Sequence, residues 1–230
     1  MKITWLGHAS FRIETDEAVI LLDPWLAGNP SFPDDRRADA IAGTTHVLVT
    51  HGHGDHASEA AEIAGAAGVP VVGIYDWISW ISDTEGVEGI GFNKGGTVRL
   101  GDAAVTMVNA VHSSSASGPS GPVYTGAEAG YMISVGDVTL YAMGDTDVMA
   151  DMALLQELHN PTHALVPIGG HFTMDARRAA FACRKFFDFK GVIPCHYATF
   201  GLLAQDADEF AALTAPLTVL TPAVMGSVDL

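Results

Sequence analysis

The stretch HVLVTHGHGDH, residues 46–56, joins a short apolar run to a loop with four potential metal ligands. The run 46–50 is typical of a strand that is covered on both faces. In the six residues that follow, two glycines separate the ligands and allow tight turns, so several side chains can point at one spot. The alternative is a polar turn with solvent-facing histidines. The position at a strand end, where sites of α/β proteins gather, favours a metal site.

Six consecutive residues cannot close a metal site, so further ligands are expected at later strand ends. Three candidates follow apolar runs: His112 after residues 104–111, Asp145 after 138–143 and His196 after 192–194. Each alone could be an ordinary surface residue. Together with the loop they supply five histidines and two aspartates, which is enough for two metal ions in open coordination. Neutral imidazole suits zinc, iron, manganese or nickel.

The rest of the chain repeats one pattern in two halves. Predicted strands at 3–6, 10–14 and 18–22 lead into alternating strands and helices, and hairpin strands at 131–135 and 138–142 do the same in the second half. Predicted helices cover 58–67, 75–82, 148–158, 175–187 and 206–213. The pattern predicts an α/β protein with two packed sheets and outer helices, in a single domain over residues 1–230.

Residues 113–127 (SSSASGPSGPVYTGA) interrupt this pattern with serine, glycine and proline. An interdomain linker and a flexible loop without a role are alternatives. Because the segment follows His112 and long unstructured loops are usually functional or disordered, we predict a loop that acts as a lid over the site.

Charge and composition exclude several classes of protein. Eleven Lys and Arg against 27 Asp and Glu give a net charge of −16, which disfavours nucleic acid and anionic membranes as partners. An apolar content of 48% excludes a disordered chain. The N-terminus lacks a signal-peptide pattern and no apolar run approaches a membrane span, so a cytoplasmic protein acting on a small molecule is expected. Homo-oligomerisation stays open.

The motifs carry a family resemblance. HGHGDH matches the HxHxDH signature of the metallo-β-lactamase superfamily. Wider motifs resemble the small prokaryotic "predicted metal-dependent hydrolase" family, which is similar to the ascorbate-6-phosphate lactonase-like proteins. These motifs span residues 1–205 and lie at 2–9 (KITWLGHA), 22–24 (LDP), 28–30 (GNP), 112–114 (HSS), 144–146 (GDT), 167–170 (PIGG), 173–174 (TM), 193–194 (IP) and 196–197 (HY). The resemblance implies a four-layer αββα sandwich, with hydrolytic chemistry between the sheet edges.

The resemblance also implies residue roles. One metal ion would be held by His51, His53 and His112, the second by Asp55, His56 and His196, and Asp145 would bridge both. Two divalent ions are implied, with zinc favoured over manganese, nickel or iron. A hydroxide between them would attack a small ester, lactone, amide or phosphodiester, and Asp55 would take a proton as a catalytic residue.

Three further residues receive roles from the same comparison. Asp23 resembles an acidic residue that hydrogen-bonds the ligand loop, with a turn cap before Pro24 as the alternative. His8 resembles a histidine that lines the substrate site, although a satisfied histidine at a strand end would look the same. His171 stands in the GG-x-(F/Y)-T-M stretch, and we expect it to line the substrate pocket rather than to bind metal.

Two other functions remain as alternatives. Di-iron flavoprotein oxygen reductases have Glu at the position of His53 and carry a flavin domain, so the ligand pattern speaks against a di-iron redox enzyme. A noncatalytic metal-binding or metabolite-binding protein is disfavoured by the complete ligand set.

Overall fold

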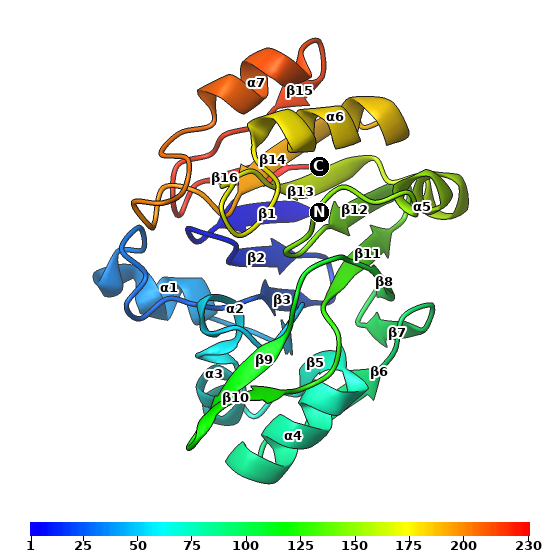
Figure 1. Cartoon of the computed structure of the whole chain (residues 1–230). Helices are drawn as coiled ribbons and strands as arrows, with labels where there is room; N and C mark the ends of the chain where they lie inside the picture. Colours follow the sequence, from blue (N-terminus) through cyan, green and yellow to red (C-terminus); the bar gives the residue numbers. More distant parts are fainter.

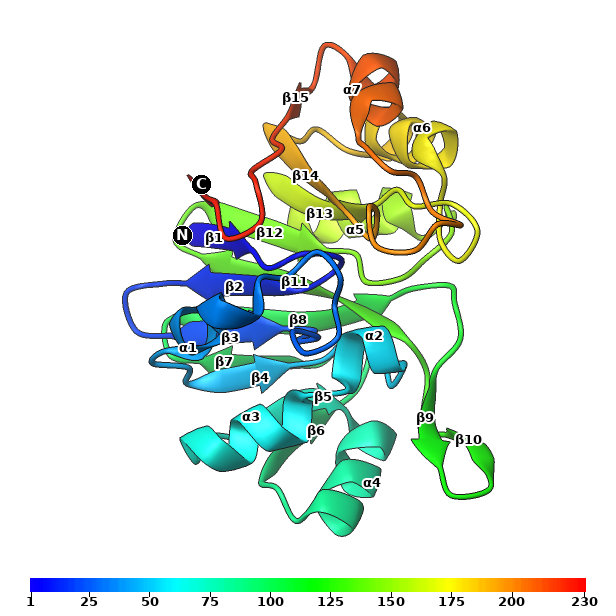
Figure 2. The same cartoon turned by 90° about the vertical axis from the view of Figure 1, so that its left-hand side faces the viewer.

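The computed structural model describes all residues 1–230, and its centre consists of two seven-stranded sheets. The sheets lie face to face, with helices on the outer side of each (Figure 1). In Figure 2, α3 and α4 lie at the bottom of the molecule and α6 and α7 at the top. The predicted αββα sandwich is therefore confirmed.

The first sheet contains the N-terminal strands and one strand from the C-terminus. β1, β2 and β3 form an antiparallel meander, after which β4, β5 and β6 run parallel to β3. In spatial order the strands are β16 (Ser227–Asp229), β1 (Lys2–Trp5), β2 (Phe11–Glu14), β3 (Val19–Leu22), β4 (His46–Leu48), β5 (Val71–Ile74) and β6 (Gly89–Phe92).

The second sheet repeats this arrangement of antiparallel and then parallel strands. Its spatial order is β15 (Thr218–Val219), β14 (Gly191–Cys195), β13 (His163–Pro167), β12 (Val138–Ala142), β11 (Ala129–Val135), β8 (Ala103–Asn109) and β7 (Thr97–Leu100). β7, β8, β11 and β12 are antiparallel, and β12 to β15 are parallel. In each half, the loops at one end of the parallel strands carry candidate ligands.

The helices divide between the two outer layers. The 3-10 helix η1 (Asp34–Arg36) and α1 (Arg37–Ile41), α2 (Gly54–Ala57), α3 (Ala60–Ala67) and α4 (Tyr75–Glu85) belong to the first half. The second half contributes α5 (Met152–His159), α6 (Ala176–Phe186) and α7 (Asp208–Thr214). None of the helices has the length and apolar character that a membrane span requires.

One hydrophobic cluster of 58 buried residues fills the space between and around the sheets. The two sheets are also tied by a hydrogen bond, in which the buried Tyr131 hydroxyl on β11 donates to the carbonyl of Val49, 2.6 Å away, just after β4. This contact lies next to the HGHGDH loop, so the packing of the sheets helps to set the position of that loop.

The structure corrects the expectation for residues 113–127. The segment forms a β-hairpin of β9 (Ser115–Gly118) and β10 (Gly121–Tyr124), which pairs with neither main sheet. It projects from the body beside α4 (Figure 2). A turn of Gly118-Pro119-Ser120-Gly121 allows the chain to reverse, and four cross-strand residue pairs supply the order that the composition alone did not indicate. Also unpredicted were α1, α2, β6 and β16, which are short or depend on distant partners.

Candidate metal centre

The HGHGDH loop presents its side chains from a tight turn that leads into α2. His53 precedes the first residue of α2, and Asp55 and His56 lie in its single turn. His51 lies three residues after the end of β4 and is 1% exposed, whereas His53 remains partly accessible. Gly52 is packed so closely that a Cβ there would lie 2.8 Å from the Thr125 hydroxyl. Only glycine fits at this point of the turn.

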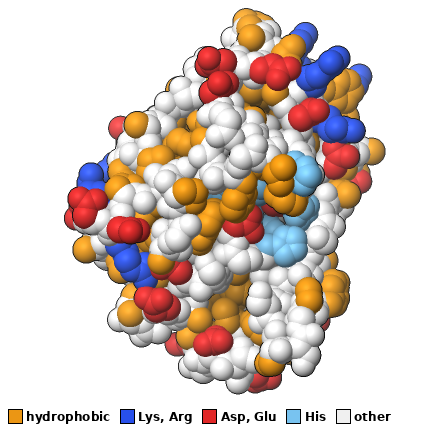
Figure 3. All heavy atoms as spheres, turned by 60° about the vertical axis from the view of Figure 1, so that its left-hand side comes forward, with side chains coloured by type: hydrophobic (Ala, Val, Ile, Leu, Met, Phe, Trp, Pro, Cys, Tyr) orange, Lys and Arg blue, Asp and Glu red, His pale blue; other side chains and the backbone are white.

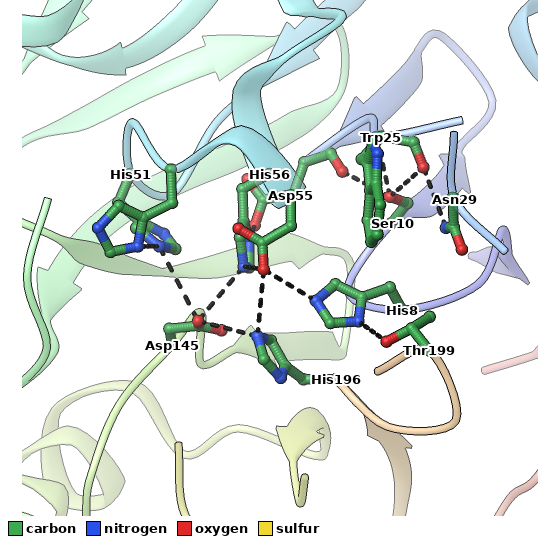
Figure 4. Close-up of polar contacts among 12 residues, drawn as sticks. His8, Ser10, Trp25, Asn29, His51, Asp55, His56, Asp145, His196 and Thr199 are labelled. Carbon is green, nitrogen blue, oxygen red and sulfur yellow. Dashed lines mark hydrogen bonds and ion pairs between the residues drawn. The ribbon is translucent and has the colours of Figure 1, made fainter. Parts of the chain in front are cut away.

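Asp145 lies at the centre of the cluster of candidate ligands. It follows β12 and is 3% exposed. Its Oδ2 lies 3.1 Å from Nε2 of His196, 3.3 Å from Nε2 of His56, 3.5 Å from Nε2 of His112 and 3.9 Å from Nε2 of His51. Figure 4 shows His51, His56 and His196 pointing toward this carboxylate from different segments. One oxygen thus faces ring nitrogens of four histidines.

The candidate ligands fall into groups whose ligand atoms lie within 4.8 Å of one another. The groups are His51, His53 and His112; His8, Asp55, His56 and His196; and His51, His56 and Asp145. The first two groups match the two ion sites expected from the sequence, with His8 added to the second. The third places Asp145 between them.

The donor atoms fit metal ions in their chemistry. Four buried polar atoms of the cluster have no hydrogen-bond partner: His56 Nε2, Asp145 Oδ1, and both ring nitrogens of His196. His56 and His196 approach Asp145 at ion-pair distance, but not in hydrogen-bond geometry. Buried polar atoms nearly always have a hydrogen-bond partner or a bound ion. These unpaired atoms therefore indicate that the cluster binds a further partner. Imidazole nitrogen and carboxylate oxygen suit zinc and related divalent ions.

Burial sets the protonation of the histidines. It lowers the pKa of His51, His53 and His112, which favours the neutral imidazole that binds metal. His56 differs: burial alone would lower its pKa, but the carboxylates of Asp145 and Asp23 outweigh burial and raise it. For Asp145, burial is outweighed by His56 and His196, so its pKa is held well below the usual range. The carboxylates of Asp145 and Asp23 therefore favour the protonated form of His56.

Asp23 supports the ligand loop from behind. This residue is 1% exposed and follows β3. Its Oδ1 accepts from the backbone N–H of Thr50 at 2.7 Å, while Oδ2 lies 2.7 Å from the Thr50 hydroxyl and 2.8 Å from Nδ1 of His56. The Asp23 side chain makes these contacts and does not cap the turn before Pro24. Such a partner fixes the ring orientation of a ligand.

His8 lies inside the cluster rather than along an open pocket wall. It is fully buried, its Nε2 lies 3.2 Å from Asp55 Oδ2, and its Nδ1 lies 2.7 Å from the Thr199 hydroxyl (Figure 4). Its backbone carbonyl accepts from the N–H of His196. Burial is the largest influence on His8 and lowers its pKa to about 4. The expected pocket-lining residue is thus in direct contact with a candidate ligand.

His171 stands apart from this arrangement. Its side chain is exposed, its ring packs at 4.5 Å against Phe172, and it forms no hydrogen bond or ion pair with the cluster. Its φ of +44° reflects the turn between Gly170 and Met174. The structure gives no contact that supports the predicted pocket role.

Several supporting residues were not found from the sequence. Thr199 contacts His8, Glu128 accepts from the backbone N–H of His112 at 3.1 Å, and Ser114 accepts from that of Gly52 at 3.2 Å. On the outer side, a stacked pair of Trp25 and Phe200 lies beside His8. Thr199, Glu128 and Phe200 lie in no motif, so their sequence positions carry no signal of a role. Ser114 lies in the HSS motif at 112–114, and Trp25 directly follows the LDP motif at 22–24. Figure 3 shows histidine side chains reaching the surface on one face, with hydrophobic side chains near them.

Comparison with known proteins places the chain in a family. A model of the beta-lactamase superfamily domain matches residues 2–196. A UPF0173 metal-dependent hydrolase of Paracoccus denitrificans is 58% identical over 230 residues and is matched over 100% of both chains. A metallo hydrolase of the archaeon Ignicoccus hospitalis superimposes with a TM-score of 0.86 at 32% identity, over 99% of this chain and 97% of that one.

The chain therefore belongs to the beta-lactamase superfamily, which confirms the resemblance read from its motifs. Within it, the chain is a metal-dependent hydrolase of the family represented by the Paracoccus protein. CmlA, a diiron β-hydroxylase from Streptomyces venezuelae, shares the fold with a TM-score of 0.76 at 14% identity, over 100% of this chain and 54% of that one. At this identity the likeness concerns the fold alone.

Proposed function

We propose that the protein hydrolyses a small ester, lactone, amide or phosphodiester at a centre of two divalent ions, with zinc as the favoured metal. The observation that carries the proposal is the position of Asp145, whose Oδ2 faces four histidines that come from three segments of the chain. When bound, two divalent cations would lower the pKa of bound water toward neutrality and polarise the attacked group.

The residues divide between the two ions as their distances suggest. His51, His53 and His112 would hold one ion, Asp55, His56 and His196 the other, and Asp145 would contact both. Asp23 and Glu128 hold parts of this set in place through the hydrogen bonds described above. No serine or cysteine nucleophile is needed for this chemistry.

The environment of Asp55 favours a ligand role over proton transfer. Burial would raise the pKa of this carboxyl, but the hydrogen bond from His8 and the nearby His56 reverse that effect and lower it. A carboxylate with a lowered pKa is a weak proton acceptor at neutral pH. Asp55 therefore serves better as a ligand that stays ionised than as the catalytic base expected from the sequence.

A small-molecule substrate agrees with the charge of the protein. The net charge is −16, and the side chains grouped in the cluster are histidines and aspartates. Nucleic-acid phosphates would meet a repulsive field before they reached the centre. We therefore exclude nucleic acid from the proposed substrates.

The test combines metal analysis with a substrate panel. Purified protein loaded with zinc is assayed on ester, lactone, amide and phosphodiester substrates and its metal content is measured. His53→Ala and Asp145→Ala should lose turnover and bind less metal, whereas Asp147→Ala, which changes an exposed carboxylate two residues away, should retain both. Turnover retained after both ions are lost would refute the proposal. Stoichiometric iron with oxygen uptake would instead identify a redox enzyme, and a fully loaded protein without turnover would identify a binding protein.

A further inference from the structure

A groove of about 580 Å³ lies between α3, α4 and the β9–β10 hairpin. It begins at Gly52 and Gly54, the two glycines that flank the candidate ligand His53. In Figure 3 the surface below the exposed histidines is hollowed, with hydrophobic side chains in its walls. The volume is in the range of pockets for small ligands, roughly 300–1,000 Å³. The groove is therefore large enough for part of a substrate whose reacting group lies at the metal centre.

Eight of the sixteen residues that line this groove are hydrophobic, and two of these are tryptophans. Trp77 and Trp80 on α4 form one side, and Ala61 and Gly65 on α3 form the other. The small residues leave open the space that larger side chains would fill. Ser117 and its neighbour Ala116 on the hairpin close the third side. A channel with this lining suits an extended hydrocarbon arm, which gains free energy from burial and needs no polar partner.

All charged side chains that line the groove are negative. Its only charged lining residues are Glu62 and Glu85, and no Lys or Arg contributes to the lining. Glu62 is oriented by an ion pair with Arg37, whose guanidinium lies 2.6 Å from its carboxylate. An anionic arm would meet the carboxylate of Glu85 and the carboxylate of Glu62, which is paired with Arg37, and no cation in the lining itself.

We propose that this groove binds an extended, uncharged acyl or alkyl arm of the substrate. The assignment rests on the proposed hydrolytic function and names its substrate class: compounds with an apolar chain of several carbons next to the scissile bond. The groove begins at the loop that carries His53, and its charged lining residues are all negative. Both features favour such an arm over a phosphorylated or carboxylated one.

Gly65→Leu provides a way to block the groove without disturbing the fold. A Cβ at Gly65 would meet only Val87, at 3.9 Å, which is ordinary contact, and leucine is a better helix former than glycine. Ala67→Leu is the matched control, because Ala67 lies two residues further on the same helix, is exposed and does not line the groove. Ala61→Leu is a second, independent block.

The binding test uses the zinc-loaded protein with 1-butanol, 1-hexanol and 1-octanol, followed by calorimetry and by the fluorescence of the tryptophans. Affinity should rise about fourfold for each added methylene. Gly65→Leu and Ala61→Leu should lower octanol affinity at least tenfold, whereas Ala67→Leu should leave it unchanged. Octanol binding that survives both blocking variants would overturn the assignment.

The kinetic test compares p-nitrophenyl acetate, p-nitrophenyl hexanoate and the mono-p-nitrophenyl ester of adipic acid, whose six-carbon chain ends in a carboxylate. We expect kcat/KM to be highest for the hexanoate, and Gly65→Leu to reduce it for the hexanoate but not for the acetate. Equal rates for hexanoate and adipate would overturn the assignment. If no ester is cleaved while octanol binding responds to the variants, ester hydrolysis is excluded from the proposed function and the groove assignment stands. If all esters are cleaved at rates that do not depend on chain length, the proposed hydrolysis stands and the groove assignment fails.

Discussion

At the scale of single residues, two buried carboxylates organise the histidines from opposite sides. Asp145 faces their Nε2 atoms, whereas Asp23 contacts Nδ1 of His56 and the backbone of Thr50. Substitution of the two residues should therefore affect metal binding differently, because Asp145 would be a ligand and Asp23 would hold a ligand in place.

Asp23→Ala should weaken metal binding about 10- to 100-fold without deleting a ligand, because the ring of His56 loses the partner that orients it. The Thr50 N–H is also left without its acceptor. Competition with a chromophoric chelator measures the affinity. The control is Asp16→Ala, an exposed carboxylate that should have no effect. Unchanged affinity in Asp23→Ala would show that His56 does not depend on this contact.

His8 and His171 provide a contrast between a buried and an exposed histidine. His8→Asn removes the contact with Asp55 and keeps a residue that tolerates the φ of +52°, so we expect metal affinity to fall about tenfold or more. His171→Asn, also at positive φ, should leave metal content unchanged because its ring contacts only Phe172. Metal analysis after dialysis compares the two. Equal metal retention would contradict the position of His8 within the centre.

At the scale of elements, the parallel strands deliver ligands to one edge, and the turns that follow them require unusual backbone. His51 follows β4, Asp145 follows β12 and His196 follows β14. Gly144, the residue before Asp145, has φ +64°, and His196 itself has φ +57°. The chain must turn sharply at these points to direct the side chains between the sheets.

Gly144→Ala should destabilise the protein by more than the cost of positive φ alone, which is about 1–2 kcal/mol. The added Cβ would lie 2.6 Å from the carbonyl oxygen of Ala129, so β11 or the Asp145 turn has to move. Gly136→Ala is the control, since it has φ +54° but nothing within 4 Å of the new Cβ. Chemical denaturation should give a larger loss for Gly144→Ala, with reduced metal content only there. Equal losses of stability in the two variants would mean that the turn at Gly144 accommodates the added Cβ without further cost.

At the scale of the whole molecule, the two sheets meet around a buried centre of titratable groups. Nε2 of His56 and Nε2 of His196 lack hydrogen-bond partners beside Asp145, and a bound ion would satisfy them. Metal binding should therefore stabilise the packing of the two halves as well as provide chemistry.

Removal of metal should lower the thermal midpoint. At a free metal concentration of about 1,000 Kd, one site contributes about 4 kcal/mol, and each kcal/mol shifts the midpoint of a chain of this size by about 2–4 °C. For two such sites we expect a decrease of about 16–32 °C after chelation, with full recovery at two equivalents of zinc. Calorimetry during titration measures both. Recovery that is complete at one equivalent would contradict two ions.

Much of the site was predictable because its signals are local. The HGHGDH loop combines ligand types, glycine spacing and a strand end within a few residues, and the strands before Asp145 and His196 are continuous apolar runs. The same signals predicted the two-sheet architecture, since repeated hydrophobic patterns specify which segments are buried.

Other features depended on contacts between distant segments. β16 exists because it pairs with β1 at the other end of the chain, and the contact of His8 with Asp55 joins residues 47 positions apart. The hairpin at 115–124 has a composition that favours a loop, and its order comes from cross-strand pairing.

The sequence by itself determined the chemistry of the centre and the kind of fold, because residue types, glycine positions and hydrophobic period are local properties of the chain. Tertiary structure alone decided which histidines face Asp145, that His8 joins them while His171 does not, and that a groove opens beside His53. The physical reason is that these features are set by the distances between packed segments, and a linear pattern does not contain those distances.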